Sequence, residues 1–174
     1  MTYNIHPILV HFPIALLLLY SFIKIIPFEK YFPSVAWRQI QRALLFFGVL
    51  SAFAALGTGE TAQHLLQPNR ALVHMHSYFA SLSTWLYGLL LIGEILFVLN
   101  TSDMPVFNFL KSEIIKKFSI PLQNVLCHPI FSKLLAFFGF IAISITGLLG
   151  GVMVYGVSAD PFSSIILKLL GINL

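Results

Sequence analysis

Four long apolar runs constrain the fold of this chain more than any other feature of its sequence. They extend over residues 7–26, 38–64, 71–99 and 133–157. A helix that crosses a bilayer needs about 20 mostly apolar residues, and each run reaches that length. The sequence therefore predicts an all-α integral membrane protein in which residues 1–174 form a single four-helix bundle. Pro27 is expected to end the first helix, and Asn69 is expected to cap the third.

The composition excludes several classes of protein. Hydrophobic residues make up 58% of the chain and charged residues only 9%, against about 25% charged in an ordinary soluble domain. The net charge of +4 resides in the loops, so it indicates membrane topology, and no nucleic-acid partner is expected.

The single cysteine, Cys127, excludes an internal disulfide, and without a C-x-x-C-H motif covalent c-type haem is excluded too. No removable signal peptide is expected, because a basic n-region and a cleavage site are missing.

The distribution of Lys and Arg predicts the side of the membrane that each loop occupies. Four spans place both termini on one side, together with the loop around Gln67. Eight of the ten Lys and Arg belong to the opposite side: Lys24, Lys30, Arg38, Arg42, Lys111, Lys116, Lys117 and Lys133. Positively charged loops stay in the cytoplasm. We therefore expect a multi-pass protein of the bacterial inner membrane, with the long basic loop cytoplasmic and both termini non-cytoplasmic.

The long basic loop has a helical pattern of its own. Over residues 105–120, apolar side chains recur at helical spacing, and lysines fall between them. The apolar positions are Phe107, Leu110, Ile114, Ile115 and Phe118. This pattern predicts an amphipathic helix that lies on the inner leaflet. The tail over residues 163–174 is expected to lie on the opposite surface in the same way.

Most of the histidines converge at the non-cytoplasmic end of the predicted bundle. The direction of each helix brings six ionisable residues there from three spans: His6, His11, Glu60, His64, His74 and His76. Ionisable residues inside a membrane are costly, and by default they mark a functional site. The competing interpretation is that these side chains lie at the interface and are solvated by water.

Spacing indicates which of these side chains can act together. Glu60 and His64 are four residues apart and share a helix face. His74 and His76 are two apart and diverge, so only one can face the bundle centre; the deeper His76 is favoured. At the cytoplasmic end, Glu94 and Lys24 lie at a similar depth. These two residues are expected either to pair with each other or to extend to the interface.

Small residues gather at the same end as the histidines. They are Gly57, Gly59, Gly147, Gly150, Gly151 and Gly156. Small residues allow two helices, or a helix and a flat ligand, to approach closely, and the sequence favours neither alternative. Tyr155 either caps a ligand site by hydrogen bonding or anchors the helix at the interface.

Three motifs in these regions resemble a known family. The chain has "HPILVHFP" near its start, "GTGE" near the end of the second span and "GGVMVYG" at the end of the fourth. It thereby resembles, over nearly its whole length, an uncharacterised bacterial four-helix membrane domain of unknown function with HPxxVHFP and GGxxVY motifs. By position, the resemblance marks His6, His11, Glu60, His76 or His74, Gly150, Gly151 and Tyr155. Related domains can accompany c-type cytochrome modules, which implies redox work.

The leading functional hypothesis is a membrane b-type haem protein for electron transfer. Four-helix bundles build cofactor sites from facing helices, and histidine is a common axial ligand of haem. The favoured ligands are His11 and His76, with His6 and His74 as further candidates, and Gly57, Gly59, Gly150 and Gly151 would admit the ring. The expected partners are the lipid bilayer, quinone or a membrane or periplasmic redox protein, and further copies of the chain in an oligomer.

Two alternatives use the same residues differently. In the first, His11, His76, Glu60, His64 and His74 hold a zinc, copper or iron ion, and the protein binds or transports that metal. In the second, the protein is a structural subunit of a respiratory complex. Catalytic hydrolysis is not expected, because the six Asp and Glu are too few for paired-carboxylate chemistry.

Overall fold

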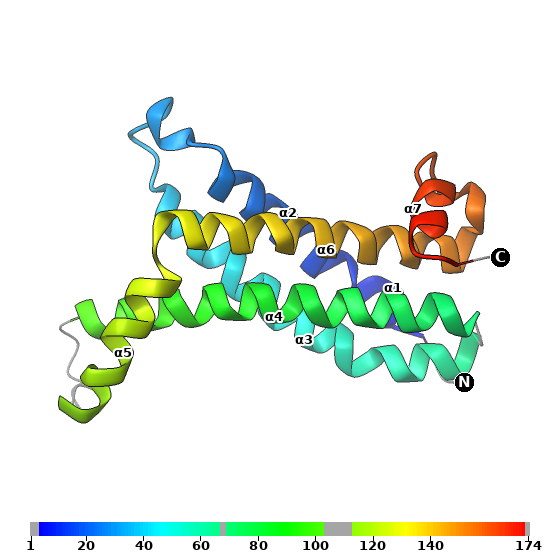
Figure 1. Cartoon of the computed structure of the whole chain (residues 1–174), viewed down its shortest axis with the longest axis horizontal. Coiled ribbons are helices and arrows are strands. Elements are labelled where there is room, and N and C mark those ends of the chain that lie inside the picture. The colour runs from blue at the N-terminus through cyan, green and yellow to red at the C-terminus, as the bar shows by residue number, and fades with distance from the viewer. Residues whose placement is uncertain (1–3, 67–68, 103–112, 173–174) are drawn as a thin grey trace.

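The computed structural model describes residues 4–66, 69–102 and 113–172, and the regular elements within them are all helical. In chain order these are α1 (His6–Leu9), α2 (His11–Ile25), η1 (Phe28–Lys30), α3 (Trp37–Leu66), α4 (Arg70–Thr101), α5 (Glu113–Leu126), α6 (Pro129–Tyr155), η3 (Val157–Ala159) and α7 (Ser163–Leu169). Figure 1 shows the long helices side by side, with α5 and α7 at opposite ends of the bundle.

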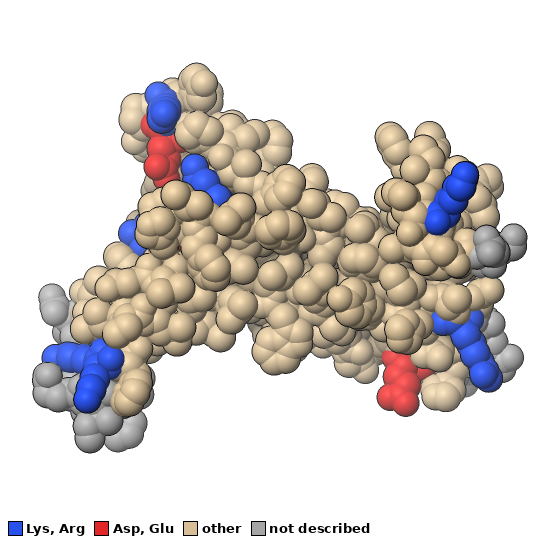
Figure 2. Space-filling view, in the orientation of Figure 1, with Lys and Arg blue, Asp and Glu red and all other residues tan. Residues whose placement is uncertain are grey.

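The structure confirms the prediction of four apolar helices long enough to cross a membrane. They are α1 together with α2, α3, α4 and α6. A helix satisfies its own backbone hydrogen bonds, which is why such long apolar runs are helical in lipid. In Figure 2, the charged side chains on the visible face gather at the two ends of the bundle, with an uncharged belt between them. That distribution is the one a bilayer requires.

The helix ends follow the chemistry of individual residues. The side chain of Asn69 caps α4 as predicted, because its Oδ1 accepts a hydrogen bond from the backbone N–H of Ala71 at 2.9 Å. The first span is interrupted at Val10, between α1 and α2. Pro13 lacks the N–H that would bond the carbonyl of Leu9, so the helix is weakest at this point.

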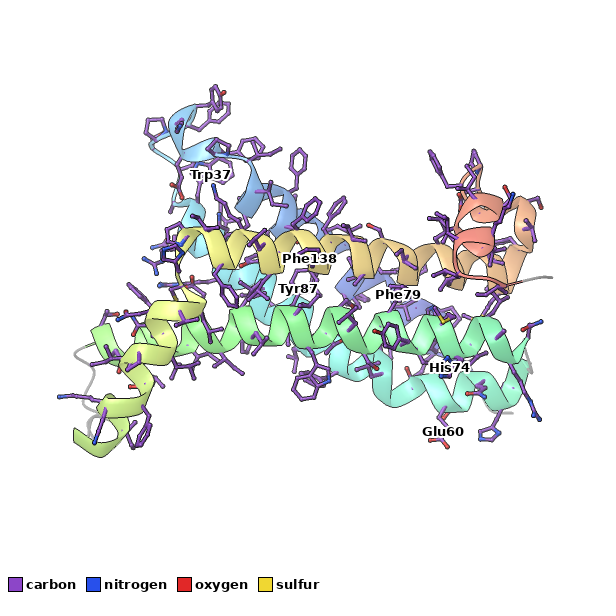
Figure 3. All side chains as sticks on the ribbon, in the orientation of Figure 1. Trp37, Glu60, His74, Phe79, Tyr87 and Phe138 are labelled. Carbon is purple, nitrogen blue, oxygen red and sulfur yellow. The ribbon has the colours of Figure 1, made fainter. Side chains whose placement is uncertain are left out.

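A chain of hydrogen bonds joins three helices in the middle of the core. The hydroxyl of Ser21 on α2 donates to the carbonyl of Ala136 on α6 at 3.1 Å. Its oxygen lies 2.7 Å from the hydroxyl of Tyr87 on α4. Because Ser21 has only one hydroxyl hydrogen, Tyr87 must be the donor to Ser21. The fully buried Tyr87 is labelled between α4 and α6 in Figure 3.

The close approach of α4 and α6 depends on Gly139, which lies against the ring of Tyr87. A Cβ added to Gly139 would lie 2.9 Å from Tyr87 Cζ, nearer than real Cβ contacts come. We therefore expect Gly139→Ala to lower the free energy of unfolding by about 1–3 kcal/mol, the usual cost of overpacking. Reversible unfolding in detergent would measure the change. Gly88→Ala is the control, since a Cβ there has nothing within 4 Å; equal stability losses in both variants would contradict the explanation.

The short helices at the bundle ends are attached by specific contacts. The predicted helix over residues 105–120 overlaps α5, although residues 103–112 lie outside the described part of the chain. Asn100 of α4 donates to Gln123 of α5 at 2.7 Å. The C-terminal α7 buries Leu167 against α6, whereas Leu169 on its other side is exposed. The tail is therefore packed on the bundle on one face only.

Candidate functional site

The fold brings five of the six histidines to one end of the bundle. This histidine end consists of the beginning of α1 and α2, the end of α3, the beginning of α4 and the end of α6. The histidines that lie there are His6, His11, His64, His74 and His76. The structure divides them into two that pack into the bundle, His6 and His76, and three that are exposed.

His6 is fixed between α1 and α3 by a threonine. Its Nδ1 lies 3.0 Å from Thr58 Oγ1, and Thr58 donates its single hydroxyl hydrogen to the carbonyl of Ala55 at 3.0 Å. With the hydroxyl hydrogen on that carbonyl, the hydrogen between the two side chains comes from His6 Nδ1. In the neutral ring, this leaves the lone pair on Nε2 available to a ligand.

His76 is fixed against α6 in the same manner. Its Nδ1 lies 3.0 Å from the carbonyl oxygen of Thr146. A carbonyl can only accept, so Nδ1 is the donor and Nε2 again carries the lone pair. Histidines that bind a metal usually donate their other ring N–H to a carbonyl or a similar group, which is the arrangement both of these residues have.

The remaining predicted ligands are exposed side chains. His11 is exposed, and its Nδ1 bonds the carbonyl of Pro7 one turn earlier in the chain. His74 is exposed as well. Glu60 and His64 share a face of α3, but their side chains are 88% and 79% exposed and lie 4.0 Å apart. In Figure 3, Glu60 extends away from the bundle.

The structure does not assemble the larger metal site that the sequence suggested. Among the described residues, no group of three or more His, Cys, Asp and Glu side chains could hold a metal ion. The reason is helix rotation: α3 turns the shared face of Glu60 and His64 outward, and α2 carries His11 on its exposed side. What remains at this end is a pair of partly buried histidines, His6 and His76, on two different helices.

Two of the predicted glycines lie against the two histidine rings. A Cβ built on Gly59 would lie 3.7 Å from His6 Cε1, and one built on Gly150 would lie 3.4 Å from His76 Cε1. At Gly57 a Cβ would have nothing within 4 Å, so this glycine borders no part of the site. Gly151 is half-buried, and Tyr155 is 75% exposed, as suits an interfacial aromatic residue.

The sequence interpretation missed the residues that orient the two rings. Thr58 lies within "GTGE" and Thr146 lies within the fourth apolar run, and neither was identified as part of a site. A threonine in an apolar span was the available signal, since such a residue is placed to bond another helix. The bond from His76 to the backbone of Thr146 has no signal in the sequence.

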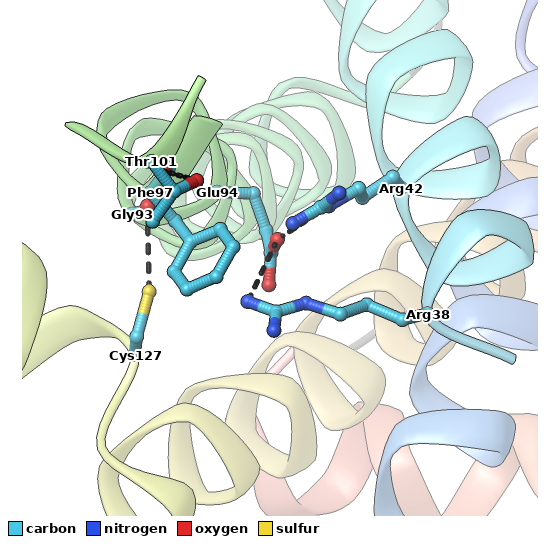
Figure 4. Close-up of polar contacts among 7 residues, drawn as sticks. All are labelled: Arg38, Arg42, Gly93, Glu94, Phe97, Thr101 and Cys127. Atoms are coloured by element: carbon cyan, nitrogen blue, oxygen red, sulfur yellow. Dashed lines mark hydrogen bonds and ion pairs between the residues drawn. The ribbon is translucent and has the colours of Figure 1, made fainter. Parts of the chain in front are cut away.

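An ion-paired cluster occupies the opposite end of the bundle (Figure 4). Arg42 Nε lies 2.8 Å from Glu94 Oε2, and Arg38 lies 3.7 Å from the same oxygen. The guanidinium of Arg38 also lies 3.7 Å above the ring of Phe97. Glu94 and Lys24 were expected to pair or to reach the interface; the ion pairs of Glu94 are instead with two arginines, which are four residues apart on α3 and both reach α4. Both arginines therefore form ion pairs with the Glu94 carboxylate.

Cys127 lies beside this cluster, between α5 and α6, and its Sγ donates to the carbonyl of Gly93 at 3.3 Å. Burial raises the pKa of the Cys127 thiol. Because only the thiolate is nucleophilic, we expect iodoacetamide at pH 8 to label Cys127 more slowly than a free thiol, and to do so faster as the pH rises. Labelling of this single cysteine can be followed by intact mass spectrometry. A rate equal to that of N-acetylcysteine would contradict the prediction.

The chain matches no protein-family model, no curated protein and no solved structure. Its function is therefore inferred from the arrangement of its own side chains.

Proposed function

We propose that this chain is a membrane b-type haem protein that transfers electrons, and that His6 and His76 would hold the haem. One observation carries the proposal: two imidazoles from different helices lie at one end of the bundle, and each has Nδ1 occupied and Nε2 available. A haem brings four nitrogen ligands of its own and needs one or two from the protein, whereas a bare zinc ion usually takes four. A two-histidine site suits the haem better.

The surroundings of the pair are compatible with a flat, apolar cofactor. Gly59 and Gly150 place no side chain against either ring. The neighbouring core contains Leu72, Leu149 and Val152, which exclude water. When bound, the haem would supply one-electron redox chemistry. The protein would hold it through the two histidines, and the bonds to Thr58 and Thr146 would fix the ring orientations.

The proposed sidedness places this site near the periplasm. Seven of the nine Lys and Arg that the structure describes lie at the opposite end of the bundle, which the positive-inside rule assigns to the cytoplasm of a bacterial inner membrane. In Figure 1, α1 and α7 lie at the same end, so both termini would be periplasmic. The protein would then pass electrons between quinone or a membrane partner and an acceptor on the periplasmic side.

An absorption spectrum tests the proposal directly. The protein, expressed with haem supplied and purified in detergent, should show a Soret band when oxidised and sharp α and β bands after reduction with dithionite. Metal analysis of the same sample should give iron in proportion to haem. A colourless protein would overturn the proposal: stoichiometric zinc or copper would then favour a metal-binding protein, and no metal would favour a structural subunit.

A further inference from the structure

The end of the bundle opposite the histidines contains a cavity of about 380 Å³. It lies where α2 ends, where α3 and α6 begin and beside Glu94 of α4. The proposed electron transfer makes no use of it. Its volume is in the range of sites that hold small ligands.

The lining of this cavity is rich in cations. Lys24, Arg38 and Lys133 come from three different helices, and the carboxylates on its wall are Glu29 and Glu94. Glu94 already forms ion pairs with Arg38, which lines the cavity, and with Arg42, which does not. In the part of the chain that the structure describes, the ion pairs include neither Lys24 nor Lys133. The two ammonium groups therefore share the wall with one carboxylate outside these ion pairs, that of Glu29, and the balance leaves a net positive charge for an anion.

The position and the apolar part of the lining indicate where that anion comes from. The cavity lies at the ends of the helices that are long enough to span a membrane, where a bilayer around them would place its headgroups. Phe28 and Trp37 line it and stack with ring centroids 5.3 Å apart, and Trp is typical of the membrane interface. Ile23 and Ile26 add an apolar wall. A phospholipid would match both features. Its phosphate would pair with the ammonium groups, and its acyl chains would pack against the apolar wall.

We propose that this cavity binds the phosphate of an acidic phospholipid, with Lys24 and Lys133 as its ligands and Arg38 at its edge. Basic pockets between transmembrane helices are known to take acidic headgroups. Arg38 already shares Glu94, so its contribution is secondary. Gln41 lines the same cavity; its Nε2 donates one hydrogen to the carbonyl of Ile23 at 3.4 Å and has a second hydrogen to offer.

The test measures binding of phosphatidylglycerol to the full chain in detergent, with the double variant Lys24→Gln and Lys133→Gln. Each lysine near a membrane surface is worth about fivefold in affinity, so the double variant should bind roughly thirtyfold more weakly. The matched control is Lys117→Gln with Lys168→Gln, which removes the same charge from exposed positions outside the cavity. It should bind the lipid as the unchanged protein does. Thermal unfolding of all three proteins confirms that each is folded.

Two further ligands separate the sources of the anion. Phosphatidylcholine should bind at least about tenfold more weakly, because it has no net negative charge to offset the lysines. Inorganic phosphate at millimolar concentration should not displace the lipid; displacement would mean that the site takes a soluble anion, and would overturn the proposal. An equal loss of binding in both double variants would overturn it as well, since attraction would then depend on net charge alone.

The single cysteine supplies an independent measure of occupancy. Cys127 lines the cavity, so bound phosphatidylglycerol should slow its alkylation severalfold in the unchanged protein. The double variant of Lys24 and Lys133 should show little protection. Equal alkylation rates with and without the lipid would contradict binding at this cavity.

Discussion

Replacing His76 by alanine should lower the haem content of the purified protein by more than about tenfold. Loss of a residue that only orients a metal-bound histidine already costs ten- to a hundredfold in affinity, so loss of a ligand should cost at least as much. The haem released into pyridine and alkali, divided by the protein concentration, measures the effect. Any haem that stays should lose its sharp reduced α band, because one axial ligand would be missing.

The controls for this experiment are the neighbouring histidines. His74 is two residues away and exposed, so His74→Ala should keep both the haem content and the spectrum. His6→Ala should behave as His76→Ala does, whereas His11→Ala should retain haem. Loss of haem in the His11 variant together with retention in the His6 variant would contradict the assigned pair and restore the pair favoured by the sequence.

Exchanging Glu94 for glutamine should lower the free energy of unfolding by about 1–3 kcal/mol, the cost of leaving buried polar groups without their partner. The carboxylate receives Arg42 at 2.8 Å and Arg38 at 3.7 Å. Arg42 Nη2 is already buried without a hydrogen-bond acceptor, so loss of the pair would leave still more of the guanidinium unsatisfied. Chemical unfolding in detergent would measure the difference.

The matched control for Glu94 is Glu60→Gln, which also removes one carboxylate. The Glu60 side chain is 88% exposed, and exposed substitutions usually change stability by less than about 0.5 kcal/mol. Adding Arg42→Met to the Glu94 variant should recover part of the lost stability, because the unpaired charge is then absent. Equal effects at Glu60 and Glu94, or no recovery in the double variant, would contradict the role of the ion pair.

The helices could be predicted from the sequence because lipid leaves an apolar run few alternatives. A backbone inside a bilayer must bond to itself, so each run of about 20 residues becomes a helix whatever its detailed packing. Chain direction then decides which end each residue occupies, which is why His6 and His76 were expected at the same end. The cap at Asn69 was predictable for a similar reason, since it depends only on neighbouring residues.

The rotation of each helix about its own axis could not be predicted in this way. His6 and His11 are five residues apart, so the face of the first span that meets α3 decides which of them packs inward. In the structure His6 reaches Thr58, and His11 is exposed. The partner of Glu94 was uncertain for the same reason, because Lys24 and Arg42 lie at similar depths on different helices.

The buried hydroxyls at the bundle centre have a consequence for proton movement. Tyr87 donates to Ser21, and Ser21 donates to the backbone carbonyl of Ala136. A carbonyl has no hydrogen to pass on, so this relay ends inside the protein and conducts no protons from one side to the other. Electron transfer at the histidine end would therefore not pump protons along this path.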